Sequence, residues 1–409
     1  MPRHLIRPCC FPSGIPPGRG DEMAAPAGRR VLVIAPFPYP IDRGSPIRAR
    51  RLVELAERAG HDVVVVTYDA GLRSPSSAAV RRGALRLRIA RAGFCWQKLP
   101  CDLDLLRVVV REVRRHKPDV IDGHVHEGLL LALLGRLARP SARVVYNAHG
   151  TLAEEMVHSG HLAAGSLGHR VAARLESALT RRADHVLAQS LHRADSLVAG
   201  GLPADRVSVL LDGPEPGLFP AARSMSYRRR FAPDDAILAV YTGSMEPYQG
   251  VDDIVAAAAL VPDLHVVLFG SPAGDLADRV AAAGLASRVH VVDPAPYTEL
   301  PTLLAAADIA LAPRHYGGNV PGKVPAYLAA GLPVIATDVA GLREVVDETV
   351  GVVVPAGDVA ELASALRLLA ADPERREKAR AEALRRAAEW YGEATAAAAL
   401  AIAYGEATA

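Results

Sequence analysis

Three glycine-rich stretches hold the residues whose types and spacing are best suited to binding a phosphate group. In the first, Gly44 and Ser45 stand just before a helical pattern, and Arg43 and Arg48 lie close by. Backbone N–H groups at a helix start attract an anion, and arginine side chains reinforce them. An ordinary turn with a serine cap accounts for the same residues equally well, so both interpretations stay open.

The second stretch reads Gly243-Ser-Met-Glu-Pro-Tyr-Gln-Gly250 and also leads into a helix. Glycine at each end permits a close approach of the backbone, and the helix start again favours a phosphate. Asp252 and Asp253 fall in the first turn of that helix, where carboxylates complement the helix dipole. We therefore interpret these two acids as structural.

The third stretch, residues 313–325, combines several glycines with one lysine between a strand and a helix, which suits a diphosphate. Its spacing Gly317-x-x-x-x-Gly322-Lys323 fits a P-loop, but Val324 stands where a hydroxyl residue would bind magnesium. We therefore expect a diphosphate site and no P-loop ATPase. The chain has 47 Lys and Arg residues in all. Only four of them are lysines, so a lysine here favours a specific role.

The histidines give weaker signals. His124, His126 and Glu127 follow a strand, but no further Cys/His cluster lies nearby in the sequence, so we expect no metal site. His149 ends another strand and is expected to point toward a ligand, with a buried structural histidine as the alternative. The motif Asp102-Leu-Asp104 stands at a predicted helix start, where N-capping explains it.

The elements that must position these residues form two series of short apolar runs separated by helical patterns. This alternation predicts two doubly wound, Rossmann-like α/β domains that face each other across a cleft, with ligands beyond the carboxyl ends of parallel strands. The Pro/Gly-rich stretch Leu211–Ser226 cannot continue a helix or strand and separates the two series. The predicted strands are Val31–Ala35, Val63–Tyr68, Leu85–Ala90, Val120–His124, Val144–Ala148 and Val186–Ala188, then Ala236–Tyr241, Leu264–Phe269, Val289–Val292, Ile309–Ala312, Val334–Ala336 and Val352–Val354.

Helices are predicted between the strands and at the end of the chain. In the first series they are Ile47–Arg58, Leu103–His116, Leu129–Leu137 and Leu167–Arg182, and a helical tail from Ala360 is broken by Pro373. The helix at 167–182 is basic and amphipathic, so it can lie on an anionic membrane, although a solvated surface explains it equally well. The predicted domains are a disordered extension at 1–28, an acceptor-side domain at 29–210, a hinge at 211–226, a nucleotide-sugar domain at 227–372 and closing helices at 373–409.

The amino-acid composition and the charge exclude several classes of protein. The chain has 409 residues, 50% of them hydrophobic, and a net charge of +2. This excludes a disordered chain, and no apolar run reaches the roughly 18 residues of a membrane span. Residues 1–205 carry 30 Lys and Arg against 19 Asp and Glu, so an excess of basic charge gathers in the first half and favours an acidic partner. Few aromatics and no nucleic-acid motif make nucleic acid the weakest candidate. Four cysteines without a disulfide or zinc spacing predict reduced thiols.

In their order along the chain, these motifs resemble retaining glycosyltransferases of family 4. The resemblance rests on the early glycine-containing loop, the His149-Gly150 pair, the segment 183–190, the Pro-rich hinge, the loop Gly243–Gly250 and Tyr327-Leu-Ala-Ala-Gly-Leu-Pro-Val-Ile335. It covers roughly residues 30–370. It implies the GT-B fold, in which two Rossmann-like domains enclose the active site.

The resemblance also implies roles for individual residues, and the sequence departs from the usual family motif at several positions. Ser244 and Gln249 stand where most members carry Arg and Lys on the donor diphosphate, and Gly318 and Ala326 stand where two glutamates are usual. A variant with a Tyr-Gln-Gly loop and a Gly-Lys pair, as at Tyr248–Gly250 and Gly322-Lys323, implies that Lys323 and Arg314 restore the lost charge. The implied residues are His149 and Lys323 for catalysis; Gly44, Ser45, Gly243, Ser244, Gln249, Gly250, Arg314, Gly318, Asn319, Gly322 and Lys323 for the donor; and Arg43, Arg48, His124 and His126 for the acceptor side.

The implied activity is a metal-independent, cofactor-free retaining hexosyltransferase that moves a sugar from a nucleotide diphosphate sugar to an acceptor hydroxyl in glycan, glycolipid or polysaccharide biosynthesis. We also expect a glycan or lipid-linked acceptor and peripheral contact with an anionic membrane. The expected location is cytoplasmic, at the inner face of the plasma membrane. A degenerate relative that binds a partner enzyme or nucleotide is the alternative, since the usual charges are missing. An epimerase ranks last because it needs carboxylates that the predicted site lacks.

Overall fold

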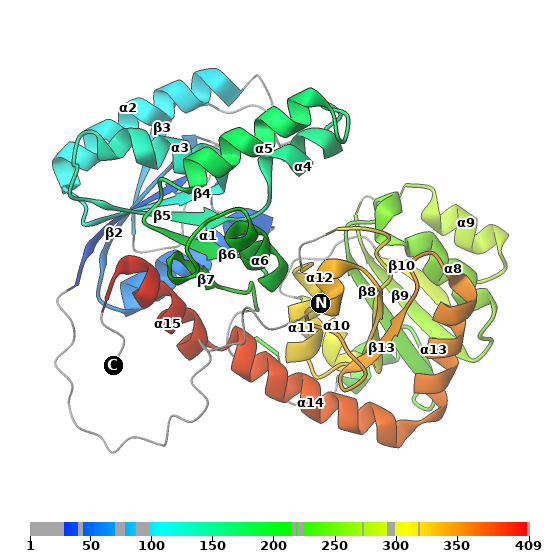
Figure 1. Cartoon of the computed structure of the whole chain (residues 1–409). Helices are drawn as coiled ribbons and strands as arrows, with labels where there is room; N and C mark the ends of the chain where they lie inside the picture. Colours follow the sequence, from blue (N-terminus) through cyan, green and yellow to red (C-terminus); the bar gives the residue numbers. More distant parts are fainter. Residues whose placement is uncertain are drawn as a thin grey trace, which may run out of the picture. The chain divides into compact units, whose positions relative to one another are not determined.

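The computed structural model divides the chain into two compact units (Figure 1). The first unit ends at Leu211 and is joined by the last segment of the chain from Glu393 onward, and the second unit is Asp212–Gly392. The structure describes residues 28–39, 44–69, 78–86, 98–214, 218–219, 224–271, 274–292, 299–317 and 320–406. The extension expected at 1–28 lies almost wholly outside these ranges.

The first unit is built on a seven-stranded, all-parallel sheet with the order β3-β2-β1-β4-β5-β6-β7. The order reverses between β1 and β4, which is the point where open parallel sheets bind ligands. Of the strand expected at Leu85–Ala90, Leu85 and Arg86 belong to β3, which begins earlier at Ala79, and residues 87–90 lie outside the described residues. Strand β7 was not expected. The strands are β1 (Arg30–Ala35), β2 (Asp62–Asp69), β3 (Ala79–Arg86), β4 (Val120–His124), β5 (Arg143–Ala148), β6 (His185–Ala188) and β7 (Val207–Val209).

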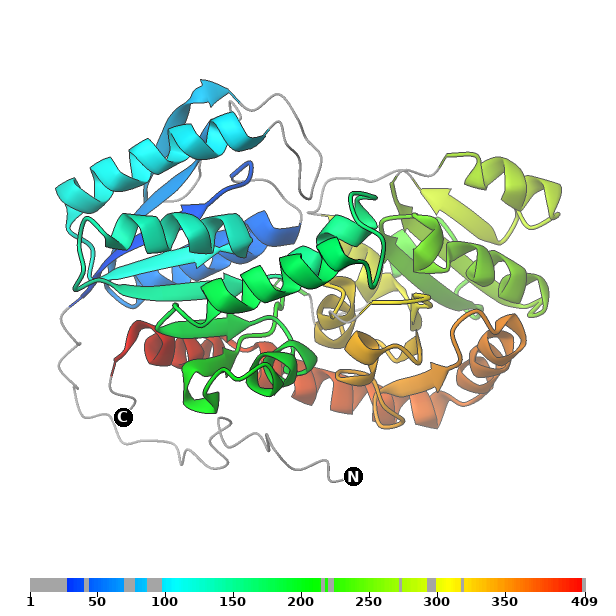
Figure 2. The same ribbon diagram turned by 45° about the horizontal axis from the view of Figure 1, so that its top comes forward.

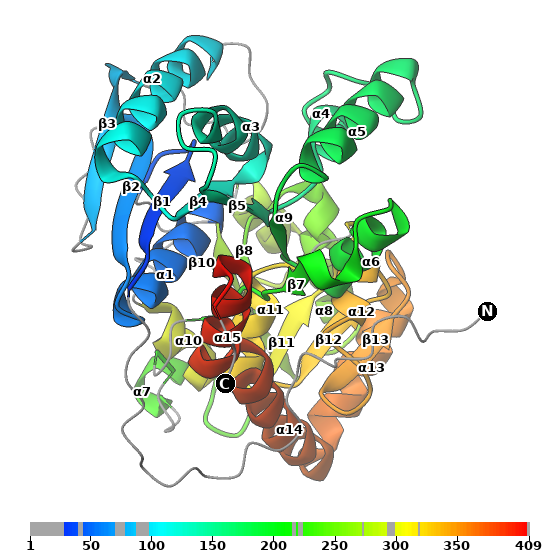
Figure 3. The same ribbon diagram turned by 60° about the vertical axis from the view of Figure 1, so that its left-hand side comes forward.

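Helices cover both faces of this sheet. Alternate residues of each strand point to opposite faces, so Leu32 and Ile34 pack in one core with α2 and α3, whereas Val31 and Val33 pack in another with α1 and α15. Figure 3 shows α15 in red. The helices are α1 (Gly44–Arg58), α2 (Leu99–His116), α3 (Val125–Arg136), α4 (Leu152–His158), α5 (Leu167–Thr180), α6 (Leu191–Ala199) and α15 (Glu393–Tyr404), with a short 3-10 turn η2 (Ala204–Arg206).

Helix α2 corrects one expectation. It begins at Leu99, with Pro100 in its first turn, where the missing proline N–H costs nothing. Asp102 and Asp104 therefore lie inside the helix and do not cap it. Asp102 accepts a hydrogen bond from the Tyr68 hydroxyl, and Asp104 accepts one from the backbone N–H of Leu85 at 2.9 Å.

The second unit is built on a six-stranded, all-parallel sheet with the order β10-β9-β8-β11-β12-β13. The two predicted doubly wound α/β domains are therefore confirmed. Here the order reverses between β8 and β11, and the loops that follow these two strands are the second and third glycine-rich stretches. The strands are β8 (Ile237–Gly243), β9 (Leu264–Gly270), β10 (Val289–Val292), β11 (Ile309–Ala312), β12 (Val334–Thr337) and β13 (Gly351–Val354).

Helices again cover the sheet of the second unit, and α8 packs beside α13 while α11 packs beside α14. Pro373 breaks the terminal helical run as expected, since it opens α14 directly after the cap residue Asp372. Helix α7 begins inside the stretch predicted as a hinge. The helices are α7 (Met225–Arg228), α8 (Val251–Ala259), α9 (Leu276–Ala282), α10 (Leu300–Ala306), α11 (Lys323–Ala329), α12 (Ala340–Arg343), α13 (Val359–Ala371) and α14 (Pro373–Tyr391), with a 3-10 turn η3 (Pro247–Gln249).

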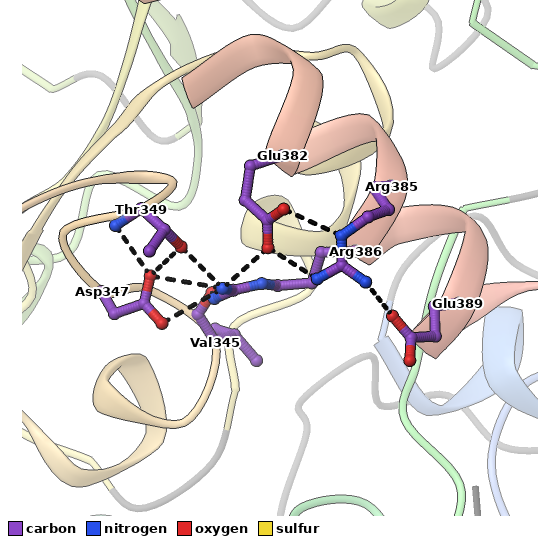
Figure 4. Close-up of polar contacts among 7 residues, drawn as sticks. All are labelled: Val345, Asp347, Thr349, Glu382, Arg385, Arg386 and Glu389. Carbon is purple, nitrogen blue, oxygen red and sulfur yellow. Dashed lines mark hydrogen bonds and ion pairs between the residues drawn. The ribbon is translucent and has the colours of Figure 1, made fainter. Parts of the chain in front are cut away.

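A buried arginine holds α14 to the loop before β13 (Figure 4). Arg386 donates hydrogen bonds to the Asp347 carboxylate at 3.1 Å, to the Thr349 hydroxyl at 2.8 Å and to the Val345 carbonyl at 3.3 Å. Although partial burial opposes the charged form, the bonds from Thr349 and Arg386 hold the pKa of Asp347 below its usual value. The region of α14 and α15 was expected to form one closing segment at 373–409. The structure separates them, because α14 packs in the second unit and α15 in the first.

Candidate active site

Two glycines shape the loop between β8 and α8 in the second unit. Gly243 has φ 118° and Gly250 has φ 71°, in the left-handed region that side chains rarely adopt. A Cβ at Gly250 would lie 2.0 Å from the carbonyl oxygen of Pro313, and one at Gly243 would lie 3.3 Å from Cε of Lys323. Glycine thus lets this loop lie directly against the loop that follows β11.

Lys323 occupies the meeting point of the two loops, in the first turn of α11. Its ammonium donates a hydrogen bond to Oε1 of Gln249 at 3.0 Å and lies 3.8 Å from the ring centroid of Tyr241. Among the residues that the structure describes, no carboxylate forms an ion pair with it. Burial, and then the positive charge of Arg314, hold the pKa of Lys323 well below its usual range. A bound negative charge would therefore stabilise the protonated form of Lys323.

Arg314 is the second cation of this group. Its guanidinium lies over the Tyr248 ring at 5.4 Å from the centroid, and burial lowers its pKa. A Cβ at Gly317, which has φ 135°, would stand 2.4 Å from Cζ of Arg314. Two neighbouring cations lined by glycine backbone form a site that suits the clustered negative charge of a diphosphate.

Aromatic rings and a histidine frame the two cations. Tyr248 and Tyr316 stack with centroids 5.3 Å apart, and Nε2 of His315 lies 2.7 Å from Oδ2 of Asp253. Asp253 is thus more than a dipole partner, because it ties α8 to the loop after β11. Asp252 instead pairs with Arg279 at 2.5 Å. The Tyr327 hydroxyl accepts a hydrogen bond from the backbone N–H of Thr242 at 2.7 Å, which fixes the end of β8.

A buried polar network lies at the centre of the first unit. Asp122 is fully buried, and it accepts hydrogen bonds from Asn147 at 2.6 Å and from the Tyr404 hydroxyl at 3.0 Å. Arg48, predicted on the acceptor side, donates to Asn147 at 3.3 Å and to the Leu210 carbonyl at 2.7 Å. Arg48 therefore joins α1 to β5 and β7 from a buried position.

Two histidines lie next to this network. Nδ1 of His124 is 3.0 Å from Nε2 of His149, and Nε2 of His124 is 3.9 Å from Oδ1 of Asp122. Burial lowers the pKa of His124 to about 3 and holds that of His149 well below its usual value, so both rings are neutral at pH 7. The edges of both rings meet Phe37, at centroid distances of 6.2 and 6.3 Å. The His149 ring is half-buried between Phe37 and His124.

His126 lies one residue beyond a strained turn. Val125 has φ 54°, a conformation that is unfavourable for a β-branched residue, and it directs His124 and His126 differently. Nε2 of His126 lies 3.0 Å from Oε2 of Glu155 and 3.4 Å from Oε2 of Glu127. Although burial opposes the charge, these carboxylates raise the pKa of His126. Among the described residues no group of three or more Cys, His, Asp or Glu side chains forms a metal site.

The remaining expected site residues are placed as follows. Gly44 is the first residue of α1 and Ser45 follows it inside the helix. Ser244 accepts a hydrogen bond from Tyr241 through its carbonyl, and its hydroxyl accepts one from the Glu246 N–H at 3.4 Å. Gly322 is exposed and directly precedes Lys323. Arg43, Gly318 and Asn319 lie outside the described residues.

The Asp122 network predicts a pH dependence of stability. Burial raises the pKa of Asp122 to about 6, whereas an unfolded aspartate titrates near pH 3.9. The folded protein therefore holds one more proton than the unfolded chain between these values, and this stabilisation is lost as the pH rises from about 4 through 6. We expect the free energy of unfolding of the wild type, measured relative to Asp122→Asn, to fall by about 2–3 kcal/mol over that interval. Urea denaturation followed by circular dichroism checks this, and equal slopes for both proteins would contradict it.

Comparisons with known proteins find families and relatives that match both units of the chain. The family model of group 1 glycosyl transferases matches residues 226–386, and that of Glycosyltransferase Family 4 matches residues 43–213. A D-inositol 3-phosphate glycosyltransferase from Nocardia farcinica is 30% identical over 353 residues, which are 80% of this chain and 76% of that protein. The chain belongs to the GT-B glycosyltransferase family.

Other members of this glycosyltransferase family match over shorter stretches. A D-inositol 3-phosphate glycosyltransferase from Thermobispora bispora is 33% identical over 233 residues, 53% of this chain and 54% of that protein. In such matches the chain spans about half the length of the curated relative.

Solved structures share the glycosyltransferase fold. Sucrose-phosphate synthase from Thermosynechococcus elongatus has a TM-score of 0.73 at 21% identity, covering 90% of this chain and 96% of its own. Anabaena HepE in complex with UDP has a TM-score of 0.71 at 17% identity, covering 90% of this chain and 97% of its own. At these identities the likeness shows the fold alone.

Sequence reasoning missed part of the candidate site in this family member. Tyr241 lies inside β8 beside Lys323, and Tyr316 lies in the loop after β11 and stacks on Tyr248. Neither tyrosine gave a spacing signal. Asp122 was missed although its position inside an apolar strand marks a buried polar residue that needs partners. Tyr404 carried no signal, because its partner Asp122 is 282 positions away.

Proposed function

We propose that this chain transfers a sugar from a nucleoside diphosphate sugar to an acceptor hydroxyl with retention of the anomeric configuration. The observation that carries this proposal is the pair of neighbouring cations, Lys323 and Arg314, against the glycine backbone of two loops in a member of the glycosyltransferase family. The UDP and UDP-glucose complexes of a neighbour with the same fold support a nucleoside diphosphate as the ligand class.

In the proposed reaction the bond between the anomeric carbon and the diphosphate oxygen breaks. Negative charge then gathers on the leaving diphosphate, so placed cations stabilise the transition state more than the ground state. Lys323 and Arg314 supply that charge in this chain. The departing phosphate oxygen takes the proton of the acceptor hydroxyl as the new bond forms on the same face of the sugar. A metal ion and a protein general base are then not needed.

Gln249 supports this proposal although it replaces an expected cation. Its side chain is buried, and its amide oxygen accepts the hydrogen bond from Lys323 at 3.0 Å. We propose that the variant loop orients the lysine through this amide and that the Tyr-Gln-Gly sequence belongs with the Gly-Lys pair. In the first unit, His149 would orient the transferred sugar through a neutral imidazole.

The acceptor and the location stay proposals. We propose a glycan or lipid-linked acceptor and a cytoplasmic site at the inner face of the membrane, supported by the excess of basic residues in the first half of the chain. No helix among the described residues is long and apolar enough to cross a bilayer.

A calorimetric binding screen tests the proposed function. We expect one of UDP, GDP, ADP and dTDP to bind, its sugar conjugate to bind as well, and release of the diphosphate to require an acceptor. The anomeric configuration of the product, read from proton couplings in NMR, is expected to match the donor. Binding without turnover would favour the degenerate alternative, and failure of every nucleotide to bind would overturn the proposal.

A further inference from the structure

A row of polar side chains runs from helix α15 to His149 in the first unit. Helix α15, red in Figure 2, packs beside α1 and against β5, β6 and β7. The Tyr404 hydroxyl on this helix donates to Oδ2 of Asp122 at 3.0 Å. His124 ends the same strand as Asp122, and its Nδ1 lies 3.0 Å from Nε2 of His149. We name these side chains the polar row; its members are Tyr404, Asp122, His124 and His149.

The carboxylate of Asp122 is held by groups that donate to it. Its Oδ1 accepts from the side-chain amide of Asn147 at 2.6 Å. Arg48 donates to the amide oxygen of Asn147 at 3.3 Å and so leaves the amide N–H for Asp122. Although burial raises the pKa of Asp122 to about 6, the side chain is ionised at pH 7. The charged or titratable side chains that face it, among the described residues, are Arg48 from α1, Tyr404 from α15 and His124 from β4.

The second nitrogen of His124 decides where that ring carries its proton. Nε2 of His124 is buried 3.9 Å from Oδ1 of Asp122 and makes no hydrogen bond within the part of the chain that the structure describes. A bare nitrogen there would direct its lone pair at a negative oxygen, whereas an N–H group is attracted to the carboxylate. The Nε2–H form of His124 is therefore favoured. Because burial lowers the pKa of this ring to about 3, its Nδ1 is then bare.

A bare Nδ1 on His124 determines the proton of His149 as well. The 3.0 Å contact between the two rings needs one N–H group, and Nε2 of His149 is the nitrogen that can supply it. Burial holds the pKa of His149 well below its usual value, so its Nδ1 carries no proton at pH 7. The His124 side chain is fully buried, whereas His149 is half-buried. The nitrogen of this pair that is left for a ligand is thus a hydrogen-bond acceptor.

We propose that the polar row holds His149 in the Nε2–H tautomer, so that Nδ1 of His149 accepts a hydrogen bond from a hydroxyl group of the transferred sugar. Tyr404, Asp122 and His124 are then positioning residues. His124, expected on the acceptor side, becomes a support behind His149, since it is fully buried. The donor sugar must carry a free hydroxyl where it meets Nδ1. The tautomer follows from the contacts alone, whereas the contact with the sugar rests on the proposed function.

Nitrogen NMR of the free protein tests the tautomer without any turnover. In a neutral imidazole the protonated and the bare nitrogen have well-separated shifts, so a spectrum that correlates ring protons with ring nitrogens shows which nitrogen carries the proton. Comparison with His149→Ala assigns this ring among the 14 histidines. At pH 8 we expect Nε2 of His149 to be protonated and Nδ1 to be bare. A proton on Nδ1 would overturn the proposal, whether or not the protein transfers sugar.

A matched pair of tyrosine variants tests the far end of the polar row. Protonation of Asp122 removes the negative charge that favours the Nε2–H form, so the wild type should lose its single tautomer as the pH falls through about 6. Tyr404→Phe removes a hydrogen bond to the charged carboxylate, which raises the pKa of Asp122, so this midpoint should rise by about one pH unit.

Tyr146→Phe is the control for this pair. Tyr146 is as fully buried in the same unit as Tyr404, and its hydroxyl makes no hydrogen bond to any described residue. Its midpoint should equal that of the wild type. A His149 tautomer that is the same at pH 5 and pH 8 in the wild type, or equal midpoints in the two tyrosine variants, would overturn the roles of Asp122 and Tyr404.

Kinetic measurements test the role of His124. His124→Leu removes the acceptor of the His149 N–H group and is expected to lower kcat about tenfold without changing nucleoside diphosphate affinity. His124→Asn places an amide oxygen near the former position of Nδ1 and should restore kcat to within threefold of the wild type. Wild-type kcat in His124→Leu would exclude positioning by His124. Absence of turnover in the wild type would instead contradict the proposed function and leave the NMR test of the tautomer in force.

Discussion

Lys323→Ala is expected to weaken nucleoside diphosphate binding at least tenfold and to reduce sugar transfer further. A hydrogen bond from a charged group contributes about 1.5–3 kcal/mol, which corresponds to a factor of roughly 10 to 150 in affinity. The ammonium lies in a partly buried site without an ion-paired carboxylate among the described residues, so an incoming diphosphate supplies the missing negative charge. Calorimetric titration with the nucleotide found in the screen measures the loss.

The pKa of Lys323 also predicts the direction in which diphosphate affinity changes with pH. Because the pKa of Lys323 lies well below its usual range in the free protein, the ammonium loses its proton as the pH rises toward that range. Diphosphate affinity is therefore expected to fall with rising pH in the wild type, and this fall should be absent in Lys323→Ala. The alanine variant should be at least as stable as the wild type, because it removes one of two neighbouring cations.

Lys378→Ala is the matched control, since Lys378 lies in the same unit, is 76% exposed and pairs with Glu374 at 2.7 Å. An exposed ion pair of this kind contributes at most about 1 kcal/mol to stability and nothing to the proposed site. Affinity within twofold of the wild type is expected. If Lys323→Ala bound the nucleotide as tightly as Lys378→Ala, Lys323 would have no part in donor binding.

His149→Ala is expected to lower the rate of sugar transfer about a hundredfold while leaving nucleoside diphosphate affinity unchanged. The imidazole is neutral and is held by the 3.0 Å contact with His124, so one fixed hydrogen-bonding group is left for the proposed contact with the transferred sugar. A misplaced sugar costs rate because the anomeric carbon, the departing phosphate oxygen and the acceptor hydroxyl no longer meet in the geometry that the reaction requires. The proposed diphosphate site, by contrast, consists of residues of the second unit, so the affinity for the diphosphate should not respond.

The split between rate and affinity makes this prediction specific. Release of the nucleoside diphosphate measures the rate, and titration with the diphosphate alone measures the affinity. His161→Ala, a change of an exposed histidine in the same unit, is the control and should leave both quantities unchanged. Equal loss of rate in the two variants, or a parallel loss of affinity in His149→Ala, would exclude a role in orienting the sugar.

Much of the architecture follows from local pattern. Apolar β-branched runs such as Val31–Ala35 favour strands buried on both faces, and glycine-rich loops after such strands are expected at the carboxyl edge of a parallel sheet. These two patterns predicted phosphate-binding loops at Gly243–Gly250 and around Lys323, and the family resemblance implied that the two act on one diphosphate. Resemblance of the ordered motifs then added the family, which the comparisons confirm.

Other features could not be predicted because they depend on residues far apart in the chain. The contact of Tyr404 with Asp122 spans 282 positions, and it forms only because α15 packs against the first unit. The start of the edge strand β3 at Ala79 was not predicted, because a strand at a sheet border has only one partner to specify its register.

Residue order alone was sufficient for the two α/β units, the glycine-rich loops and the lysine among arginines, because these depend on local spacing and on residue type. Three-dimensional packing was needed to show that Gln249, which was expected at the donor diphosphate, accepts a hydrogen bond from Lys323. It was also needed to bring His124 and His149 together. A side chain's partners and exposure depend on which distant elements meet it, and long-range contacts of this kind leave no local trace in a single sequence.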